Sequence, residues 1–579
     1  MQLRSLVFWL SFGSLTLALP SSRGSIESRD LVERQDGACT NGPRTRNCWS
    51  NGYSIATDFD AKSPPDGTIV TISNVTRANP DGSGGSRPMM LINNQYPGPT
   101  IRAKWGDTLV INVKNNLRDN GTGIHWHGVR QLNTCQHDGV PGITECPIAP
   151  GKTRQYRFRA TQFGTTWYHS HWSAQYGDGV LGTLIIDGPA TANYDEDLGV
   201  LPITDWYYPP VFTLNEVAQH SVRGPPPADN LLVNGTHINR NGGGNYAKMT
   251  VTKNKKYRIR IINTSVDNYF SVSMHGHPFT VITSDFVPIK PFITDQLMIA
   301  IGQRYDVIIN ANQTSGNYWF QVAVGACGSN SISTAGVQLG AILHYSDAPD
   351  TQPTSTGVTL RTACVEESTK NLVPFVPNEV PASVVGTADQ LTVNNFQDPN
   401  KDNLFRWLID GTPHVVDWNN PSLETVLAGS TNFGNNSNVH EMPSSGWYLW
   451  WIQSTASIAL PHPIHLHGHD FYIVGSGSGT WDGTTAGLTL SNPTRRDTST
   501  LPPGGYLLMA FPADNPGMWI MHCHIAFHAS QGLSMQFMER RSEIKGSIGD
   551  TGAFKTGCDE WDGYWFPGNH PYEMTDSGI

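Results

Sequence analysis

Short extended runs of β-branched and aromatic residues recur along the whole chain, and turn-forming residues separate them. No long segment has the 3.6-residue apolar periodicity of an amphipathic helix. This pattern predicts all-β sandwich domains, in which short strands alternate with turns. The clearest runs are Thr68–Ser73, Thr108–Val113, Tyr257–Ile262, Tyr305–Ile309 and Gly505–Phe511.

One extended segment occurs three times, each time as a glycine followed five residues later by a triplet on a tryptophan-bearing strand. The copies are Gly164 with His169-Ser170-His171, Gly316 with Gln321-Val322-Ala323, and Gly517 with His522-Cys523-His524. Internal repetition is a signature of repeated structural units. We therefore predict three related β-domains, at residues 35–190, 191–372 and 373–579, with a Pro/Thr/Ser-rich linker at 348–360.

The composition and the N-terminus predict an exported, turn-rich protein. Charged residues make up 15% of the chain, below the usual ~25%, while 58 Gly and 39 Pro favour turns over helices. Arg4 followed by an apolar run predicts a signal peptide at residues 1–20, and the Ser/Arg-rich residues 21–34 are typical of a pro-segment. No later stretch reaches the ~18 apolar residues of a spanning helix. We expect a secreted, extracellular protein without a membrane anchor.

Charge and glycosylation sequons bear on the partners. The net charge of −10 disfavours nucleic acid and anionic membrane surfaces. Sequons of the type Asn-x-Ser/Thr suit an exported glycoprotein. The candidate glycosylation sites are Asn74, Asn120, Asn234, Asn263, Asn312 and Asn435.

The eight cysteines should mostly form disulfides in an oxidising compartment. If Cys523 binds a metal, seven remain, so at least one stays unpaired. Sequence alone leaves the connectivity open. Candidate pairs are Cys39 with Cys48, Cys327 with Cys364, and Cys146 with Cys558, which leaves Cys135 over.

The triplet His522-Cys523-His524 can serve two metal sites at once, because successive side chains on a strand point to opposite faces. A thiolate with two imidazoles is the ligand set of a blue-copper electron-transfer site. The alternative for Cys523 is a disulfide, which its place between two histidines on an apolar strand disfavours.

Four His-x-His units occur, two in the first predicted domain and two in the third. Residues i and i+2 share one face of a strand, ~6.5–7 Å apart, so eight imidazoles could converge on a three-metal cluster. A single such unit is more typical of a structural pair or a zinc site, and we interpret His275, His277 and His469 in that way. The four units are His125-Trp126-His127, His169-Ser170-His171, His465-Leu466-His467 and His522-Cys523-His524.

With these units in this order, the chain resembles the multicopper oxidases, and most closely the fungal laccases of ascomycete type. The third motif extends from His462 to His469, and the fourth from His522 to Leu533. The resemblance implies three cupredoxin-like Greek-key β-sandwich domains and four copper ions: one type 1, one type 2 and a type 3 pair.

The resemblance also implies which residue binds which copper. Type 1 copper takes His462, Cys523 and His528, and type 2 copper takes His125 and His465. Type 3 copper takes His127, His169, His171, His467, His522 and His524. Leu533 stands at the axial position and cannot ligate, so we expect a high potential at the type 1 site.

Further residues match the family's substrate and proton sites. Asp267 corresponds to an acidic residue of the substrate pocket, and Asp138 to one near type 2 copper. The tail 576–579 resembles a C-terminal plug that needs no trimming, with Asp576 as a weaker proton-transfer candidate. Cys146 and Cys558 match a bridge between the first and third domains. Candidate pocket walls are Phe405, Trp407, Ile458, Leu460, Phe527 and His528.

The function implied is that of a monomeric laccase, which oxidises small aromatic reductants such as lignin-derived phenols and reduces O₂ to water. A first alternative is an extracellular metal-ion oxidase of ferroxidase type. Such an enzyme needs an acidic cation site, and the single residue Asp267 is weak support for one. A second is a copper carrier or store. Such proteins favour Met/Cys-rich sites, and the 13 methionines form no cluster in the sequence.

Overall fold

The computed structural model describes most of the chain after the N-terminal segment. The described residues are 40–50, 52–64, 75–78, 87–327, 332, 337–355, 357–568 and 576–579. The predicted signal peptide and pro-segment, the strand Thr68–Ser73, Cys39 and Asn74 lie outside these residues.

The first part of the chain forms small sheets around one buried cluster. Its main sheet has the order β3-β8-β7-β5, and β4 pairs with β6 and β1 with β2. The strands are β1 (Val75–Ala78), β2 (Met89–Ile92), β3 (Gly98–Lys104), β4 (Thr108–Lys114), β5 (Ile124–Trp126), β6 (Thr153–Arg159), β7 (Gly164–Ser170) and β8 (Leu181–Asp187).

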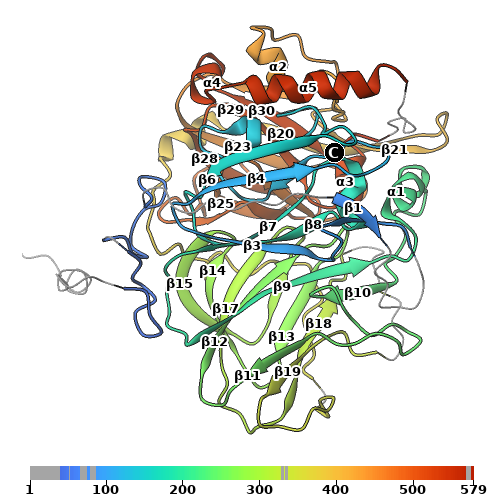
Figure 1. Cartoon of the computed structure of the whole chain (residues 1–579). Coiled ribbons are helices and arrows are strands. Elements are labelled where there is room, and N and C mark those ends of the chain that lie inside the picture. Colours follow the sequence, from blue (N-terminus) through green and yellow to red (C-terminus); the bar gives the residue numbers. More distant parts are fainter. Residues whose placement is uncertain are drawn as a thin grey trace, which may run out of the picture.

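The middle part is a two-sheet sandwich with its own core, drawn in green and yellow in the lower half of Figure 1. The sheet orders are β10-β9-β12-β17-β14-β15 and β11-β19-β18-β13-β16. The strands are β9 (Glu196–Trp206), β10 (Asn230–Val233), β11 (Lys248–Val251), β12 (Lys256–Asn263), β13 (Phe270–Met274), β14 (Phe279–Ser284), β15 (Val287–Thr294), β16 (Leu297–Ile299), β17 (Arg304–Asn310), β18 (Asn317–Val324) and β19 (Gly340–Tyr345).

The last part is a second sandwich of the same plan, with sheet orders β21-β20-β23-β28-β25-β26 and β22-β30-β29-β24-β27. The strands are β20 (Asp389–Asp398), β21 (Leu404–Ile409), β22 (Val439–Met442), β23 (Gly446–Ser454), β24 (His462–Leu466), β25 (Phe471–Ser478), β26 (Thr494–Arg496), β27 (Thr498–Leu501), β28 (Gly505–Ala513), β29 (Gly517–Cys523) and β30 (Ser534–Glu539). The α-helices of the described residues are α1 (Val211–His220), α2 (Ser422–Leu427), α3 (Ala526–Ser530), α4 (Arg541–Ser547) and α5 (Gly552–Trp565).

The three repeat segments occupy equivalent places in their sheets. Strand β7 lies between β8 and β5, β18 between β19 and β13, and β29 between β30 and β24. The all-β prediction is therefore confirmed, and the repeat corresponds to one structural position in three sheets. The domain limits themselves stay predictions.

Buried ion pairs and a disulfide join the parts of the chain. Arg304 on β17 contacts both carboxylate oxygens of Asp497, at 2.6 and 2.7 Å, and Arg496 contacts both oxygens of Asp285. Cys146 is bonded to Cys558 on α5, with Cα atoms 5.0 Å apart. The buried ion pairs fix the orientation of the joined parts more than they add to the free energy of unfolding, because removing both charges from water is costly.

Two of the cysteine pairings are confirmed. Cys327 bonds Cys364 as well, with Cα atoms 5.6 Å apart. Cys135 and Cys523 are free and buried. Cys48 is in a disulfide, and its pairing with Cys39 stays a prediction because Cys39 lies outside the described residues.

One glycosylation prediction is wrong. Asn263 is 0% exposed, and its side-chain amide donates to the carbonyls of Asn268 and Ile299 at 2.9 Å each. A glycan cannot reach this nitrogen in the folded protein. The side chains of Asn234, Asn312 and Asn435 are exposed, and that of Asn120 is half-buried. Among the described residues, no helix has the length and apolarity that crossing a membrane requires.

Candidate metal centre

The triplet on β29 divides its side chains as the strand alternation predicts. Strand β29 pairs with β24, so that Ile464 lies opposite Cys523 and His465 opposite His522. On one face, the Cys523 Sγ atom lies 3.7 Å from Nδ1 of His462 and 3.7 Å from Nδ1 of His528. These two nitrogens are 3.1 Å apart. One sulfur and two imidazole nitrogens thus face one small space.

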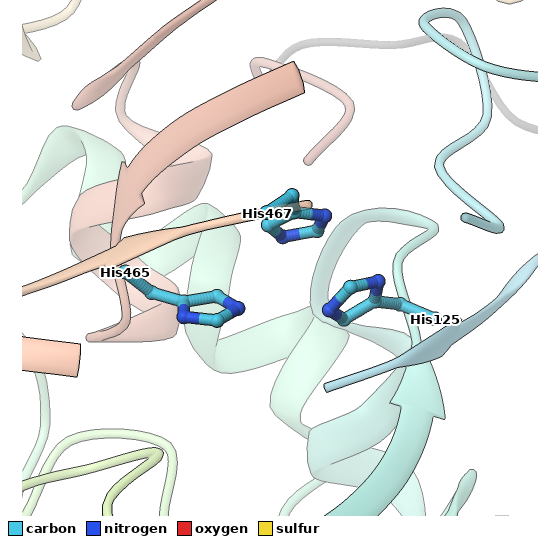
Figure 2. A group of neighbouring side chains, drawn as sticks. All are labelled: His125, His465 and His467. Atoms are coloured by element: carbon cyan, nitrogen blue, oxygen red, sulfur yellow. The ribbon is translucent and has the colours of Figure 1, made fainter. Parts of the chain in front are cut away.

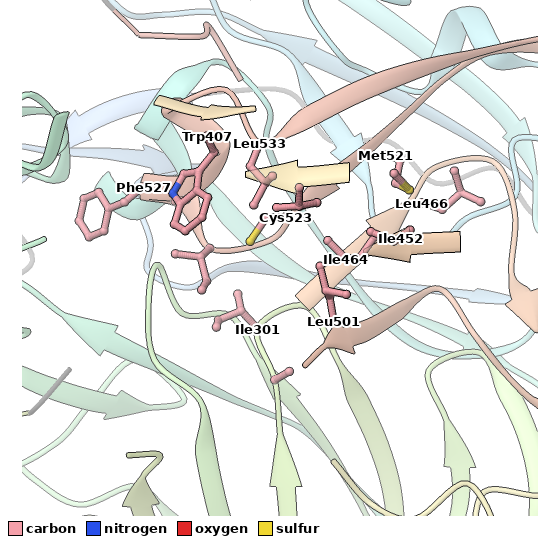
Figure 3. Packing of buried hydrophobic residues seen from close by; sticks show 14 of the residues in the cluster. Ile301, Trp407, Ile452, Ile464, Leu466, Leu501, Met521, Cys523, Phe527 and Leu533 are labelled. Carbon is pink, nitrogen blue, oxygen red and sulfur yellow. The ribbon is translucent and has the colours of Figure 1, made fainter. Parts of the chain in front are cut away.

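Apart from the two histidines, the surroundings of Cys523 are buried and apolar. Leu533 and Trp407 lie beside it in one buried cluster (Figure 3), and the Cys523 N–H donates to the Leu533 carbonyl at 2.9 Å. Burial raises the pKa of the Cys523 thiol and lowers the pKa of His462 to about 3. The imidazoles are therefore neutral donors, and a thiolate here requires a bound cation to stabilise it.

On the other face, His522 and His524 meet histidines of β5, β7, β24 and the residues just after them. The His522 Nε2 atom lies 3.4 Å from Nε2 of His171 and 3.3 Å from Nε2 of His467. The His524 Nε2 atom lies 3.2 Å from Nδ1 of His127. Histidines as far as 397 residues apart in sequence therefore bring their ring nitrogens together.

The remaining imidazoles complete the same cluster. His125 lies on β5, His465 on β24 and His467 directly after β24, and their rings surround a common space (Figure 2). His125 stacks on His467 with ring centroids 3.7 Å apart. Among the ligand groups whose donor atoms all lie within 4.8 Å of one another are His125-His465-His467, His125-His127-His169 and His171-His467-His522.

Hydrogen bonds set which nitrogen of each ring can bind a metal. The Nδ1 atoms of His125, His465 and His169 contact the carbonyls of Asp138, Asp497 and Ser170 at 2.8–3.0 Å. Carbonyls only accept, so these Nδ1 atoms carry the proton and the Nε2 atoms carry a lone pair. Each of the three Nε2 atoms is buried and has no hydrogen-bond partner. Burial and neighbouring imidazoles also keep the pKa of His465 and His169 well below the usual value. Neutral imidazole nitrogens with a lone pair and no hydrogen-bond partner are suitable ligands for copper.

Asp138 holds two of these rings from behind. Its carboxylate lies 2.7 Å from Nδ1 of His467 and 3.2 Å from Nδ1 of His125, and it is fully buried. Gly139 makes this approach possible: its φ is +82°, and a Cβ there would lie 1.8 Å from the Ile124 carbonyl oxygen. The structure thus places Asp138 beside His125, where the sequence expectation put an acidic residue.

Asp497 is a neighbour of the cluster that the sequence reasoning missed. Its carboxylate lies 3.3 Å from Nε2 of His127 and is held by Arg304. Burial raises the pKa of Asp497 to about 7, against the lowering effect of Arg304. No motif marks it; the one signal is that Arg495-Arg496-Asp497 adjoins a strand in a chain otherwise poor in charge.

A cavity of about 330 Å³ adjoins His528. Trp407 lines the cavity and packs against two histidines, with its ring centroid 4.6 Å from that of His462 and 4.9 Å from that of His528. Of the predicted residues, Asp267, Phe405, Trp407, Ile458, Leu460 and His528 line the cavity. Phe527 does not: it is 0% exposed and packs edge-on against Tyr207, so its assignment as a wall is wrong.

Asp205, also missed, fixes the turn that bears Asp267. Its buried carboxylate accepts the backbone N–H groups of Val266, Asp267 and Asn268 at 2.7, 2.9 and 3.1 Å. The Asn268 side chain adds a fourth bond at 2.8 Å. Because the three N–H groups converge on one carboxylate, the turn has little freedom, and Asp267 stays at the cavity wall.

The last four residues are buried against the cluster. Asp576 is 3% exposed and accepts hydrogen bonds from Ser173 and, at 2.9 Å, from Asn215. Ile579 lines a small internal space together with His169, His171, His522 and His524. The tail therefore covers this side of the cluster.

Comparison with known proteins agrees with this arrangement. Family models described as multicopper oxidase match residues 74–191, 197–348 and 408–543. Laccase-3 of Botryotinia fuckeliana is 50% identical over 457 residues, which cover 76% of this chain and 100% of the relative.

Solved structures give the same result. The crystal structure of the laccase from Botrytis aclada superposes with a TM-score of 0.87 at 41% identity, covering 94% of this chain and 100% of that one. Fet3p, described as a multicopper oxidase that functions in iron import, gives a TM-score of 0.74 at 26% identity, covering 85% and 95%. The chain therefore belongs to the multicopper oxidase family and, within it, to the fungal laccases.

Proposed function

We propose that this enzyme takes single electrons from phenols and related aromatic reductants in the cavity beside His528 and uses four of them to reduce O₂ to two waters. The observation that carries the proposal is the position of Cys523. It faces His462 and His528 on one side, while its two chain neighbours join the histidine cluster on the other.

The residues would hold four copper ions. His462, Cys523 and His528 form the type 1 site, His125 and His465 the type 2 site, and the other six cluster histidines the type 3 pair. Bound copper supplies the electron acceptor for the phenol and the reductant for O₂. The covalent path from Cys523 to its neighbours His522 and His524 joins the two reactions, so that the substrate and O₂ never need to meet.

The side chains around the cavity bind and orient the phenol. Phe405 and Trp407 offer apolar surface to the ring. Asp267 accepts the phenolic proton as the electron leaves, which lowers the barrier to oxidation. Asp138 and Asp576 are positioned near the cluster to take part in proton delivery to the oxygen-reducing site.

A metal-ion oxidase remains the rival function, because Fet3p shares the fold. A cation substrate requires several oxygen ligands near the type 1 histidines. Asp267 is the single carboxylate among the described cavity residues, and the walls are largely apolar. The arrangement favours aromatic substrates.

The purified protein tests the proposal. We expect four coppers per chain, a blue Cu(II)–thiolate band, and O₂ uptake on addition of 2,6-dimethoxyphenol. The kcat/KM for this phenol should exceed that for Fe(II). A colourless protein without O₂ uptake would exclude an oxidase, and a preference for Fe(II) would favour the rival. We also propose secretion and N-glycosylation. Expression in a fungal host tests secretion, and treatment of the product with endoglycosidase tests N-glycosylation.

A further inference from the structure

The cavity beside His528 contains a second charged residue that the mechanism above does not use. Arg223 belongs to the loop that follows α1, and residues 221–225 of this loop form one wall of the cavity. Among the described lining residues, Arg223 is the one Lys or Arg and Asp267 the one Asp or Glu. The cavity thus presents one charge of each sign.

The charge of Arg223 is available to a ligand. No carboxylate among the described residues lies within 4.0 Å of its guanidinium; Glu216, on the preceding helix, is instead 3.5 Å from His220. The backbone of the loop is restricted, since the Arg223 N–H donates to Ser221 Oγ at 3.0 Å and Pro225, Pro226 and Pro227 follow. The side chain itself is exposed at the mouth of the cavity.

The two charged groups suit the two ends of one molecule. Asp267 is 3% exposed, and its turn is anchored by Asp205, so it can accept a proton at a fixed place. A guanidinium binds a carboxylate through two parallel hydrogen bonds. A carboxylate placed next to Asp267 would meet a like charge. Electrostatics therefore favours an anionic substrate with its phenolic end at Asp267 and its carboxylate at Arg223.

Two of the residues that line the cavity are exposed apolar side chains. Val222 and Ile458 both line the cavity, and they are 70% and 43% exposed. Exposed branched side chains at a cavity mouth can cover the chain that connects a phenol ring to an acid group.

We infer that this cavity selects phenols that carry a carboxylate, of the hydroxycinnamate class, with Arg223 as the residue that determines this preference. The inference rests on the proposed function, since Asp267 must receive the phenol beside His528.

A matched pair of substrates tests it. Ferulate and methyl ferulate share the phenol and differ by the carboxylate alone. At about pH 6.5, where the acid is ionised, we expect a higher kcat/KM for ferulate in the wild type. Arg223→Gln should reduce kcat/KM for ferulate by about 3–10-fold, as expected for a partly exposed ion pair. The same variant should leave the ester within about twofold.

Arg240→Gln is the control variant, because Arg240 is exposed and does not line the cavity; it should leave both substrates unchanged. Equal losses for acid and ester in Arg223→Gln, or no preference for the acid in the wild type, would overturn the assignment of Arg223. Oxidation of the ester tests the proposed function independently of Arg223, because the ester carries no carboxylate. If the wild type oxidises neither compound, the proposed function and this inference both fall.

Discussion

The Nδ1 atom of His467 lies 2.7 Å from the carboxylate of Asp138, across 329 residues of chain. This contact joins the last and first parts of the molecule directly behind the histidine cluster. A carboxylate in this place orients the ring and increases its basicity toward a metal. The relationship makes Asp138 a positioning residue of the cluster.

Asp138→Asn keeps the shape of the side chain and removes its charge. We expect a loss of about 10–100-fold in kcat, the usual cost of removing a partner of a metal-bound histidine. The blue band should persist, because Asp138 does not touch Cys523, His462 or His528. Stopped-flow reduction of the blue band separates the two sites: it should stay fast while O₂ uptake slows. Equal slowing of both would contradict the assignment.

Cys523→Ser should abolish the blue band and phenol oxidation while leaving the fold intact, because serine keeps the shape but supplies no thiolate. The control is Cys135→Ser, since Cys135 is the other free, buried cysteine in the part of the chain that the structure describes. That variant should keep its colour and its turnover. The absorbance of the blue Cu(II)–thiolate band and O₂ uptake are the measurements. Phenol oxidation by Cys523→Ser would disprove the proposed electron path.

Asp267→Asn should reduce kcat/KM for phenols by about 100-fold or more, the usual contribution of a positioned base. Ferrocyanide gives up an electron without a proton, so its oxidation should stay within about twofold. Steady-state rates for both donors on the same preparation decide the matter. A parallel loss for ferrocyanide would mean that the mutation damages the copper site instead.

Asp205→Asn places an amide where several backbone N–H groups converge. Loss of a buried charged acceptor should lower the free energy of unfolding by about 1–3 kcal/mol. Phenol oxidation should fall while ferrocyanide oxidation is retained, because the turn no longer holds Asp267.

The control for Asp205→Asn is Asp229→Asn. Asp229 accepts the single backbone N–H of Tyr208 at 2.8 Å and does not contact the Asp267 turn. Thermal unfolding, measured together with the oxidation rates of the phenol and ferrocyanide, distinguishes a loss of Asp267 positioning from general destabilisation. If both variants lose equal stability and phenol activity, Asp205 has no special link to Asp267.

Leu533→Met should lower the potential of the type 1 site. The buried Leu533 carries no ligand atom and lies in the cluster around Cys523. A thioether there would supply a weak axial ligand, which tunes the potential. Redox titration of the blue band is the measurement, with Leu533→Ile as an apolar control. An unchanged or raised potential would show that the methionine sulfur does not reach the site.

Local sequence determined the chemistry of the ligand set. The alternation of a strand sends Cys523 and its two neighbours to opposite faces whatever the fold around them, and the repeat predicted that β7, β18 and β29 are equivalent strands. Hence the ligand candidates and the all-β class could be named in advance, and the resemblance to the multicopper oxidases added the acidic residues Asp138 and Asp267.

Tertiary structure alone decided what those residues touch. Asp497, Asp205 and Arg304 carry no motif, because their roles depend on contacts between distant strands. Phe527 follows the ligand strand closely yet packs against Tyr207 in the interior and does not line the cavity, and the sequon at Asn263 is buried by its neighbours. Burial and hydrogen-bond direction are properties of the packed chain. The sequence determines which atoms can bind copper, and packing determines which nitrogens are left bare to do so.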